Sequence, residues 1–286
     1  MKRKLLAFAS ASALCIAIPY AVMANGPVDE ALIIDGEVEL TTRAPAVEGM
    51  PFDEVISGWH YRTDETRALQ MDSFENPGML AVEEGAEIWH TVEGTEGKSC
   101  ASCHDDAAVS MKAVGATYPK WDEATSKPMN VELKINHCRT ENMGAEAYEF
   151  DKAGQKPLTA YIKHQALGTP LQSSLDEGEM QQWWERGEEL YYARTGQLNM
   201  SCATCHEKYN GKFIRADHLS QGNVNGFPTY RLKQSSLVSL HNRFRGCIRD
   251  TRAEFPEAFS DDLMALEVYV TWRGTGLAVE TPAVRQ

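Results

Sequence analysis

The first apolar segment of the chain is a continuous run that contains no charged residue. It extends from Leu5 to Val22, follows three basic residues and ends in the sequence Val22-Met23-Ala24. A basic start, a short apolar run and a small-x-small end are the three parts of a cleavable secretory signal. We therefore predict a signal peptide over residues 1–24 and a mature chain that is exported to the periplasm.

A membrane anchor is the alternative interpretation of this segment. The run is only about 18 residues long and is interrupted by Pro19, whereas a membrane-spanning helix needs about 20 apolar residues. No later stretch of the sequence is apolar enough to span a bilayer. We therefore expect no membrane insertion of the mature chain.

Apolar positions recur with helical spacing in the rest of the chain. Residues 158–162 and 264–268 are amphipathic segments that can close a helical domain. Residues 85–89 and 187–191 resemble each other, and each of these segments begins with glycine. Between the two halves, turn-forming residues over 168–178 interrupt the helical pattern. The pattern predicts a mainly α protein whose two halves are alike.

The boundary between the halves is expected within that turn-rich stretch. We place a first domain at 81–172 and a second domain at 173–286. The preceding residues, 25–80, contain four prolines and no motif of their own. We expect them to form an N-terminal extension that packs on the first domain.

Six cysteines remain after the predicted signal peptide is removed. Four of them fall in two Cys-x-x-Cys-His units, Cys100-Ala101-Ser102-Cys103-His104 and Cys202-Ala203-Thr204-Cys205-His206. In this pattern the two thiols add to the vinyl groups of a haem, and the adjacent histidine binds the iron. One such unit can be a redox or zinc pair, but two units in matching surroundings indicate two covalently bound c-type haems. The predicted attachment residues are Cys100, Cys103, Cys202 and Cys205, and the predicted axial histidines are His104 and His206.

The two units belong to a longer repeat. Aligning them imposes an offset of 102 residues, and the glycine that begins one helical segment then matches the glycine that begins the other. Downstream, Tyr118-Pro119-Lys120-Trp121 resembles Phe227-Pro228-Thr229-Tyr230. Each half therefore has the order helix, haem loop, proline-containing loop and helix. This order predicts two tandem cytochrome c-type domains related by duplication.

One further cysteine follows each haem unit. Cys138 lies 34 residues after His104, and Cys247 lies 41 residues after His206. The repeat assigns one spare thiolate to each iron as its sixth ligand, and a thiolate donates charge to the iron. A disulfide between Cys138 and Cys247 is the main alternative. Rival ligands are Met143, Met264, His137 and His241, of which His137 is the strongest competitor at the first haem.

The distribution of charged residues bears on the proposed iron ligands mainly near Cys247. After loss of three basic leader residues the chain has 25 basic against 41 acidic residues, a formal charge of −16, which argues against nucleic acid or anionic lipid as a partner. Near Cys247, however, basic residues gather with Asp250 alone opposing them, so the segment can hold an oxyanion and favour the thiolate. Pairing with haem propionates is the alternative role for the arginines. The basic residues are His241, Arg243, Arg245, Arg249 and Arg252, and Arg243 stands one helical turn before the cysteine.

These features together resemble the dihaem SoxA family. The resemblance rests on the two Cys-x-x-Cys-His units, the lone cysteine behind each and the segment His241-Asn242-Arg243-Phe244-Arg245-Gly246-Cys247. It covers the whole mature chain, and Arg243-x-x-x-Cys247 is its most diagnostic part. The resemblance implies a heterodimer with the small monohaem cytochrome SoxX. It also implies the activity of an L-cysteine S-thiosulfotransferase, which attaches thiosulfate oxidatively to a cysteine of the SoxYZ carrier protein.

The resemblance further implies roles for individual residues. Cys247 resembles the family's active-site cysteine, which ligates the second haem and occurs as a persulfide intermediate. Arg243 resembles the substrate-binding arginine that holds thiosulfate. A thiolate bound to iron is a poor nucleophile, whereas the outer sulfur of a persulfide can stay reactive. Electrons are expected to leave through the haems to a soluble cytochrome c acceptor.

Three other functions compete with this prediction. A dihaem thiosulfate dehydrogenase would also use a thiolate-ligated haem but would release tetrathionate. A plain periplasmic electron-transfer cytochrome would need no substrate site, and its arginines would only pair with propionates. A dihaem peroxidase is disfavoured, because two irons blocked by thiolates leave peroxide no open position.

Overall fold

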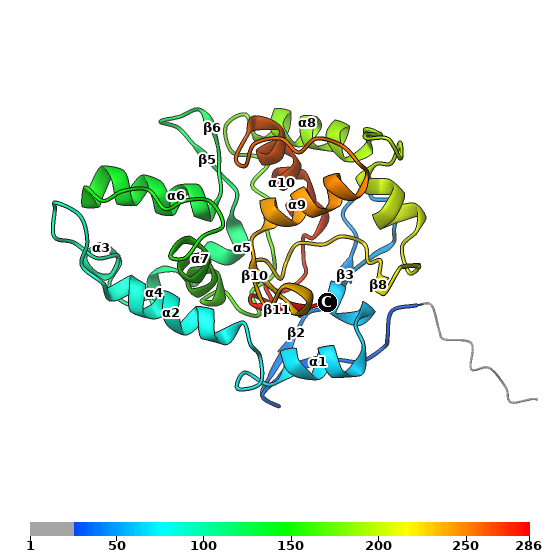
Figure 1. Ribbon diagram of the computed structural model, residues 1–286, viewed down its shortest axis with the longest axis horizontal. Helices are drawn as coiled ribbons and strands as arrows, with labels where there is room; N and C mark the ends of the chain where they lie inside the picture. Colours follow the sequence, from blue (N-terminus) through cyan, green and yellow to red (C-terminus); the bar gives the residue numbers. More distant parts are fainter. Residues whose placement is uncertain (1–25) are drawn as a thin grey trace, which may run out of the picture.

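The structure is a computed structural model, and it describes residues 26–286 (Figure 1). The signal peptide predicted at 1–24 lies outside the described residues. None of the described helices is both long and apolar enough to cross a membrane. Helices dominate the described chain, as the apolar spacing predicted, and every strand has only two or three residues.

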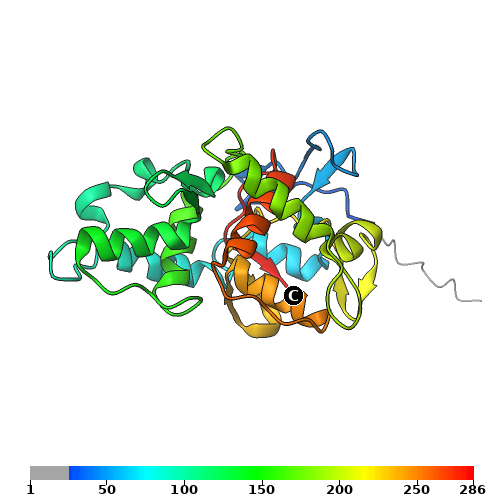
Figure 2. The same cartoon turned by 90° about the horizontal axis from the view of Figure 1, so that it is seen from above.

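Two helical units form the two lobes that are visible when the molecule is seen from above (Figure 2). The first unit runs from α2 to α7 in cyan and green, and the second runs from α8 to α10 in yellow-green to red. The first contains α2 (Met79–His90), α3 (Ala101–His104), α4 (Ala107–Ser110), α5 (Val114–Thr117), α6 (Val131–Cys138), its π-helical continuation η2 (Arg139–Met143) and α7 (Gln155–His164). The second contains α8 (Met180–Tyr192), the π-helical turn η3 (Thr204–Lys208), the 3-10 turn η4 (Leu232–Gln234), α9 (Leu240–Asp250) and α10 (Asp261–Arg273).

In each unit the first and last long helices cross at a glycine. Gly85 of α2 faces α7, where a Cβ atom on this residue would lie 2.2 Å from the Pro157 carbonyl oxygen. Gly187 of α8 faces α10 in the same way, and its Cβ would lie 2.0 Å from the Ala265 carbonyl oxygen. Only a residue without Cβ allows the two backbones to approach this closely. The glycines that the sequence repeat aligned therefore have the same structural role.

Each helix pair buries its own apolar core beside a haem-attachment loop. In the first unit, Trp89 is 1 % exposed and packs with apolar side chains of α6 and α7. In the second unit, Tyr191 and Tyr269 are each 2 % exposed and lie in the corresponding core. Cys100 and Cys202, the first cysteines of the two attachment units, pack against these cores. The repeat therefore places each attachment loop on an apolar surface.

The strands of the two units pair locally. One antiparallel hairpin, β5–β6, belongs to the first unit, and another, β7–β8, belongs to the second. A three-stranded sheet in the order β10–β9–β11 joins the C-terminal strand to the second unit, with β11 parallel to β9. The bounds are β5 (Lys120–Asp122), β6 (Lys127–Met129), β7 (Phe213–Ile214), β8 (Asp217–His218), β9 (Thr229–Arg231), β10 (Ser236–Val238) and β11 (Ala283–Arg285).

The extension before the first haem unit is folded. Two antiparallel pairs, β1–β2 and β3–β4, come first, and a 3-10 turn and a helix follow. The Thr63 hydroxyl caps that helix by accepting a hydrogen bond from the Thr66 N–H. The bounds are β1 (Leu32–Ile34), β2 (Val38–Leu40), β3 (Arg43–Pro45), β4 (Glu54–Ile56), η1 (Gly58–Tyr61) and α1 (Asp64–Met71).

The extension packs mainly on the second unit and the C-terminal segment, so the expectation that it packs on the first domain is wrong. Helix α1 lies against β11, and the buried Gln70 side chain accepts a hydrogen bond from the Val284 N–H at 3.0 Å. Asn76 donates to the Pro282 carbonyl at 3.0 Å. In Figure 2 the blue extension lies in the same lobe as the red C-terminal segment. Since its partner segment lies about two hundred residues away, no local pattern could predict this contact.

The turn-rich stretch between α7 and α8 contains no helix. Its backbone bonds to the segment that follows α10: the Gly168 N–H donates to the Val279 carbonyl at 3.0 Å, and the Leu171 N–H donates to the Leu277 carbonyl at 2.8 Å. The chain after α10 therefore returns over the junction of the two units before it enters β11.

Candidate functional site

The two haem-attachment loops have the same local structure. In the first loop the Ser99 N–H donates to the Ser102 hydroxyl at 2.9 Å, and in the second the Ser201 N–H donates to the Thr204 hydroxyl at 3.0 Å. Each hydroxyl closes a tight turn around the first cysteine of its unit. The second cysteine and the histidine follow on α3 in the first unit and on η3 in the second.

Cys100 and Cys202, the attachment cysteines that adjoin the cores, form no disulfide and have raised pKa values. None of the cysteines between residues 26 and 286 forms a disulfide, so Cys138 and Cys247 are not joined. Burial raises the pKa of Cys100 to about 11 and that of Cys202 to about 12. A neutral thiol against an apolar core suits the edge of a porphyrin, which is itself apolar.

His206 is held in the tautomer that a metal ligand needs. Its Nδ1 lies 2.9 Å from the Ser220 carbonyl oxygen. Because a carbonyl only accepts, Nδ1 carries the hydrogen and Nε2 keeps its lone pair for a metal. Gly222 lies against the ring, and a Cβ there would stand 2.7 Å from the His206 Cγ. The segment from Ser220 to Gly222 therefore fixes both the tautomer and the position of the ring.

His104 is positioned by packing instead. Its ring centroid lies 5.8 Å from that of Trp89, whose Nε1 donates to the Asp105 carbonyl at 3.1 Å. Within residues 26–286, no group accepts a hydrogen bond from the His104 ring, and the side chain is exposed. The two proximal histidines thus have different neighbours, although their attachment loops match.

Cys247 lies on α9 and faces His206. The Ser239 hydroxyl caps the start of this helix by accepting from the Asn242 N–H. Burial raises the pKa of the Cys247 thiol, but the Arg243 guanidinium and the His206 ring oppose it and bring the pKa down to about 7. The thiolate is therefore accessible at neutral pH. Since His206 and Cys247 lie close enough to interact, the two side chains can serve as axial ligands of one iron.

Cys138 ends α6 beside the first attachment loop. Burial is the largest cause that raises the pKa of Cys100, and the charge of the Cys138 sulfur is the second. The two thiols therefore lie in one site. The arginine that follows it is engaged elsewhere: Arg139 pairs with Glu93 and lies over the Tyr148 ring at 3.6 Å from the centroid. The arginine next to the spare thiol of the first unit is therefore not available to an anion.

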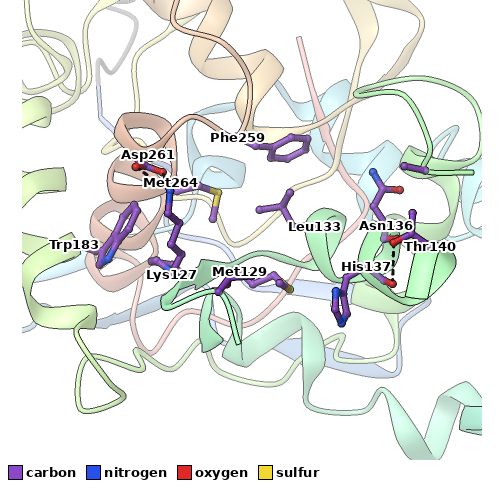
Figure 3. Close-up of a pocket in the computed structure, with 13 residues that line it drawn as sticks. Lys127, Met129, Leu133, Asn136, His137, Thr140, Trp183, Phe259, Asp261 and Met264 are labelled. Atoms are coloured by element: carbon purple, nitrogen blue, oxygen red, sulfur yellow. Dashed lines mark hydrogen bonds and ion pairs between the residues drawn. The ribbon is translucent and has the colours of Figure 1, made fainter. Parts of the chain in front are cut away.

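The rival ligands have other neighbours. His137 lines a cavity of about 420 Å³ between the two units, together with Trp183 and Met264 (Figure 3). The His241 Nε2 lies 3.0 Å from the Glu267 carboxylate, and its Nδ1 accepts from the Phe259 N–H at 3.1 Å. Both ring nitrogens of His241 are thus engaged. Met143 is buried in η2. Ligation of the two irons by Cys138 and Cys247 stays a prediction.

The basic residues that surround Cys247 in the sequence separate in the structure. Arg245 lies over the Phe255 ring at 5.1 Å from the centroid, and Arg249 lies 4.0 Å from Asp250. Among the basic residues named from the sequence, Arg243 is the one whose charge stabilises the Cys247 thiolate. Arg243 is the residue that the sequence singled out, and its role in substrate binding stays a prediction.

Two arginines from distant segments join Arg243, and sequence reasoning missed both. Burial lowers the pKa of Arg231, on β9, and the charge of Arg243 lowers it further. Burial likewise lowers the pKa of Arg62, in the extension, to about 10, with Arg285, Arg231 and Arg243 adding to the effect. We call Arg62, Arg231 and Arg243 the arginine cluster. No motif links these positions, because only the tertiary fold brings them together.

The residues of both units fit a covalently held haem. Each unit offers two thiols and a histidine on a tight turn, an apolar core against them and a spare thiol on a following helix. In the second unit the imidazole tautomer and the facing thiol also suit a six-coordinate iron. Among the residues that the structure describes, no three His, Cys, Asp or Glu side chains gather to hold a bare metal ion.

Comparisons with known proteins agree with this geometry. A family model described as SoxA/TsdA, cytochrome c domain, matches residues 84–171 and 186–279. The two matched ranges fall on the two helical units, so the predicted fold class and the prediction of c-type haem chemistry are confirmed.

Curated relatives extend the likeness to nearly the whole chain. The sequence is 70% identical over 260 residues to the L-cysteine S-thiosulfotransferase subunit SoxA of Pseudaminobacter salicylatoxidans, with 91% of each chain covered. It is 47% identical over 281 residues to the protein of the same name from Paracoccus pantotrophus, with 96% of each covered. The structure is similar to a chain of the crystal structure of SoxXA from P. pantotrophus, with a TM-score of 0.87, 46% identity and coverage of 91% of this chain and 100% of that one.

Proposed function

Since the chain belongs to the SoxA family of cytochromes c, we propose that it acts as an L-cysteine S-thiosulfotransferase, joining thiosulfate oxidatively to a cysteine of a carrier protein. The proposal rests on the position of Cys247. Its thiol faces His206 and lies close enough to Arg243 for the guanidinium charge to lower its pKa. A nucleophilic sulfur, a metal-competent imidazole and a cation meet there. The sulfur transfer needs all three.

We propose that two c-type haems serve this reaction. The first is attached by Cys100 and Cys103 and ligated by His104 and Cys138; the second is attached by Cys202 and Cys205 and ligated by His206 and Cys247. When bound, the haems supply one-electron redox chemistry and carry electrons away from the substrate. The chain itself supplies the sulfur nucleophile and the cations.

The sulfur chemistry takes place on the side chain of Cys247. Arg243 holds the sulfonate oxygens of thiosulfate, and the outer sulfur of thiosulfate forms an S–S bond with the sulfur carried by Cys247. This bond formation releases two electrons. A thiolate of the carrier then attacks the thiosulfate-derived sulfur of the new bond, takes the sulfur and its sulfonate group, and leaves the sulfur on Cys247 reduced. We infer that a persulfide on Cys247 keeps that reactive sulfur one atom away from the iron.

The partners follow from the same assignment. A small monohaem cytochrome of the SoxX type is the proposed heterodimer partner, a proposal supported by the similarity of this chain to one in the crystal structure of SoxXA. The carrier is of the SoxYZ type, and a soluble cytochrome c accepts the electrons. The predicted signal peptide supports a periplasmic location, where c-type haems and these partners would meet.

The proposal is tested by mass spectrometry of the carrier after incubation with thiosulfate, the purified protein, its small cytochrome partner and an oxidised cytochrome c. We expect a thiosulfate adduct on one carrier cysteine that requires the chain. Omission of the carrier is the matched control, and it should leave thiosulfate unconsumed. If tetrathionate accumulates at the same rate without the carrier, the chain is a thiosulfate dehydrogenase and the proposal is wrong.

A further inference from the structure

The loop that orients His206 is tied to the N-terminal extension. The Gln221 side chain donates from Nε2 to the Glu54 carbonyl at 3.0 Å and accepts at Oε1 from the Ile56 N–H at 2.8 Å. Asn223 donates from Nδ2 to the Ile56 carbonyl at 2.9 Å. Two side-chain amides therefore satisfy three backbone groups of β4, as a neighbouring strand would.

Two further contacts lie at the other end of the same loop. The Arg62 guanidinium donates to the His218 carbonyl, and the Tyr61 ring meets the His218 ring edge-on at 5.2 Å. Tyr61 and Gln221 are each 3 % exposed, so these contacts are shielded from water. Shielded hydrogen bonds hold a backbone more firmly than exposed ones. We call the contacts of Glu54, Ile56, Tyr61 and Arg62 with residues 218–223 the extension clamp.

The clamped loop is the one that contacts the proximal histidine. Ser220 lies between the two anchored ends and accepts the Nδ1 hydrogen bond of His206, while Gly222 packs against the ring. A shift of this loop would therefore lengthen that hydrogen bond or push the ring. Within the described chain, the His104 ring of the first unit has no such acceptor. A clamp of this kind therefore acts on the second haem only.

We propose that the N-terminal extension is a positioning element of the second haem: through the extension clamp it fixes the Ser220 carbonyl against His206 and thereby tunes the iron that His206 binds. A carbonyl that accepts from Nδ1 raises the basicity of the imidazole, which favours the oxidised iron. The inference rests on the proposed ligation by His206 but is independent of thiosulfate chemistry. Removing the clamp should raise the reduction potential of the second haem and leave the first unchanged.

The experiment uses the full two-haem protein carrying Gln221→Leu, titrated potentiometrically with electron paramagnetic resonance to separate the haems. The substitution keeps the buried volume but removes both amide contacts to β4. We expect the oxidised-to-reduced ratio of the second haem to fall roughly tenfold at a fixed ambient potential, a rise of about 59 mV in its midpoint. The signal and midpoint of the first haem should stay the same.

Asn225→Leu is the matched control. Asn225 is also 3 % exposed and lies in the same segment, but its amide donates to the Ala278 carbonyl at 2.8 Å and not to the extension. We expect this variant to lose a similar amount of thermal stability and to keep the midpoint of the second haem. If both variants shift that midpoint equally, or if the first haem shifts too, the clamp is only a stability element and the proposal is wrong.

A second variant covers the case in which Gln221→Leu does not mature. Asn223→Ala removes the single bond to the Ile56 carbonyl, and we expect it to shift the midpoint in the same direction by a smaller amount. No shift in Asn223→Ala, with imidazole–thiolate signals retained, overturns the clamp even where Gln221→Leu does not mature. Absence of an imidazole signal from the second haem of the wild-type protein instead overturns the ligation by His206, so the two failures are distinguishable.

Discussion

Cys138 and Cys247 occupy equivalent places in the two haem units, yet their surroundings differ in charge. Arg139, beside Cys138, is bound to Glu93 and stacked on Tyr148. Arg243, beside Cys247, belongs to no ion pair within residues 26–286 and lies with two further arginines. Arg139 is therefore neutralised by a carboxylate, whereas Arg243 is available to an anion.

We propose that this difference separates a unit that only conducts electrons from a unit that binds substrate. The units share the helix crossing, the attachment turn and the apolar core, which are what a covalently bound haem requires. They differ in the arginines that lie near the spare thiol and in the hydrogen bond that orients the histidine. We therefore propose that the duplicated fold provides two haem sites and that a few charged and hydrogen-bonding groups make the second one reactive.

The largest expected effect comes from removing each spare thiol in turn. In Cys247→Ala we expect carrier conjugation to fall by at least roughly a thousandfold, because the proposed sulfur carrier is lost. In Cys138→Ala, the matched variant, we expect most of the activity to remain. Electron paramagnetic resonance should show two thiolate–imidazole low-spin sites in the wild type and the loss of one of them in each variant.

The result that would contradict this division is equal loss of activity in both variants. A signal of the histidine–methionine type from both haems of the wild type would also show that neither cysteine is a ligand. A disulfide-linked peptide that contains Cys138 and Cys247 would show that the two cysteines pair with each other.

The next effect concerns the cation beside the reactive thiol. In Arg243→Ala we expect conjugation to fall roughly ten- to 150-fold, since a charge-assisted hydrogen bond is worth about 1.5–3 kcal/mol. Arg243→Lys should recover only part of the rate, because a point charge does not reproduce the planar fork. Lys134→Ala is the matched control, since Lys134 stands four residues before Cys138 as Arg243 stands before Cys247. Wild-type rates in Arg243→Ala would show that the arginine cluster serves the haem propionates alone.

Much of this comparison could be predicted from the sequence, because the relevant signals are local or repeated. The attachment cysteines and the histidine that follows them form one short motif, and the offset between the motifs aligned Gly85 with Gly187. Both glycines lie at a helix crossing for the same steric reason. The contact of Arg243 with Cys247 follows from helical spacing, since four residues make about one turn.

The rest depends on contacts between distant segments. Arg62 reaches the second unit from the extension, and Arg231 reaches it from β9, so neither has a sequence relation to Cys247. The extension was expected on the first domain because it precedes that domain in the chain. Its actual partner is the C-terminal strand together with the loop after η3. Backbone groups that pair across such separations leave no periodic signal.

A test of the shared part of the two units is the pair Gly85→Ala and Gly187→Ala. Alanine favours a helix over glycine by about 1 kcal/mol, but a Cβ within about 2 Å of a carbonyl oxygen forces the helices apart at a cost of up to about 3 kcal/mol. We expect a net loss of about 2 kcal/mol in the free energy of unfolding for each variant, measured by denaturant titration. A variant of the neighbouring exposed residue, Glu185→Ala, is the control. Stabilisation by either glycine substitution would contradict the close crossing.

The two units are also joined by a buried polar network. Glu267 of α10 accepts a hydrogen bond from Asn130 of the first unit at 2.9 Å and pairs with His241 at 3.0 Å. Burial raises the pKa of Glu267, but the bond and charge of His241 and the bond of Asn130 outweigh it, so the net pKa is lowered. Glu132, nearby, has a raised pKa because of burial and the charge of Glu267. The pKa values of the two neighbouring carboxyl groups are therefore shifted in opposite directions.

The smallest expected effect is the pH dependence of this junction. Because its folded pKa is lowered, Glu267 contributes stability above the ordinary glutamate pKa of 4.5, and this contribution is lost as the pH falls through the folded pKa. The pH dependence of the Glu132 contribution has the opposite sign, because that contribution is lost as the pH rises through its raised pKa.

We expect Glu267→Gln to cost about 1 kcal/mol at pH 7, since the amide keeps one hydrogen bond and loses the charge. The difference from the wild type should shrink as unfolding is measured below pH 4.5, whereas the exposed control Glu257→Gln should show no such trend. A difference that grows on acidification would mean that Glu267 is the protonated partner and that the two glutamates have exchanged roles.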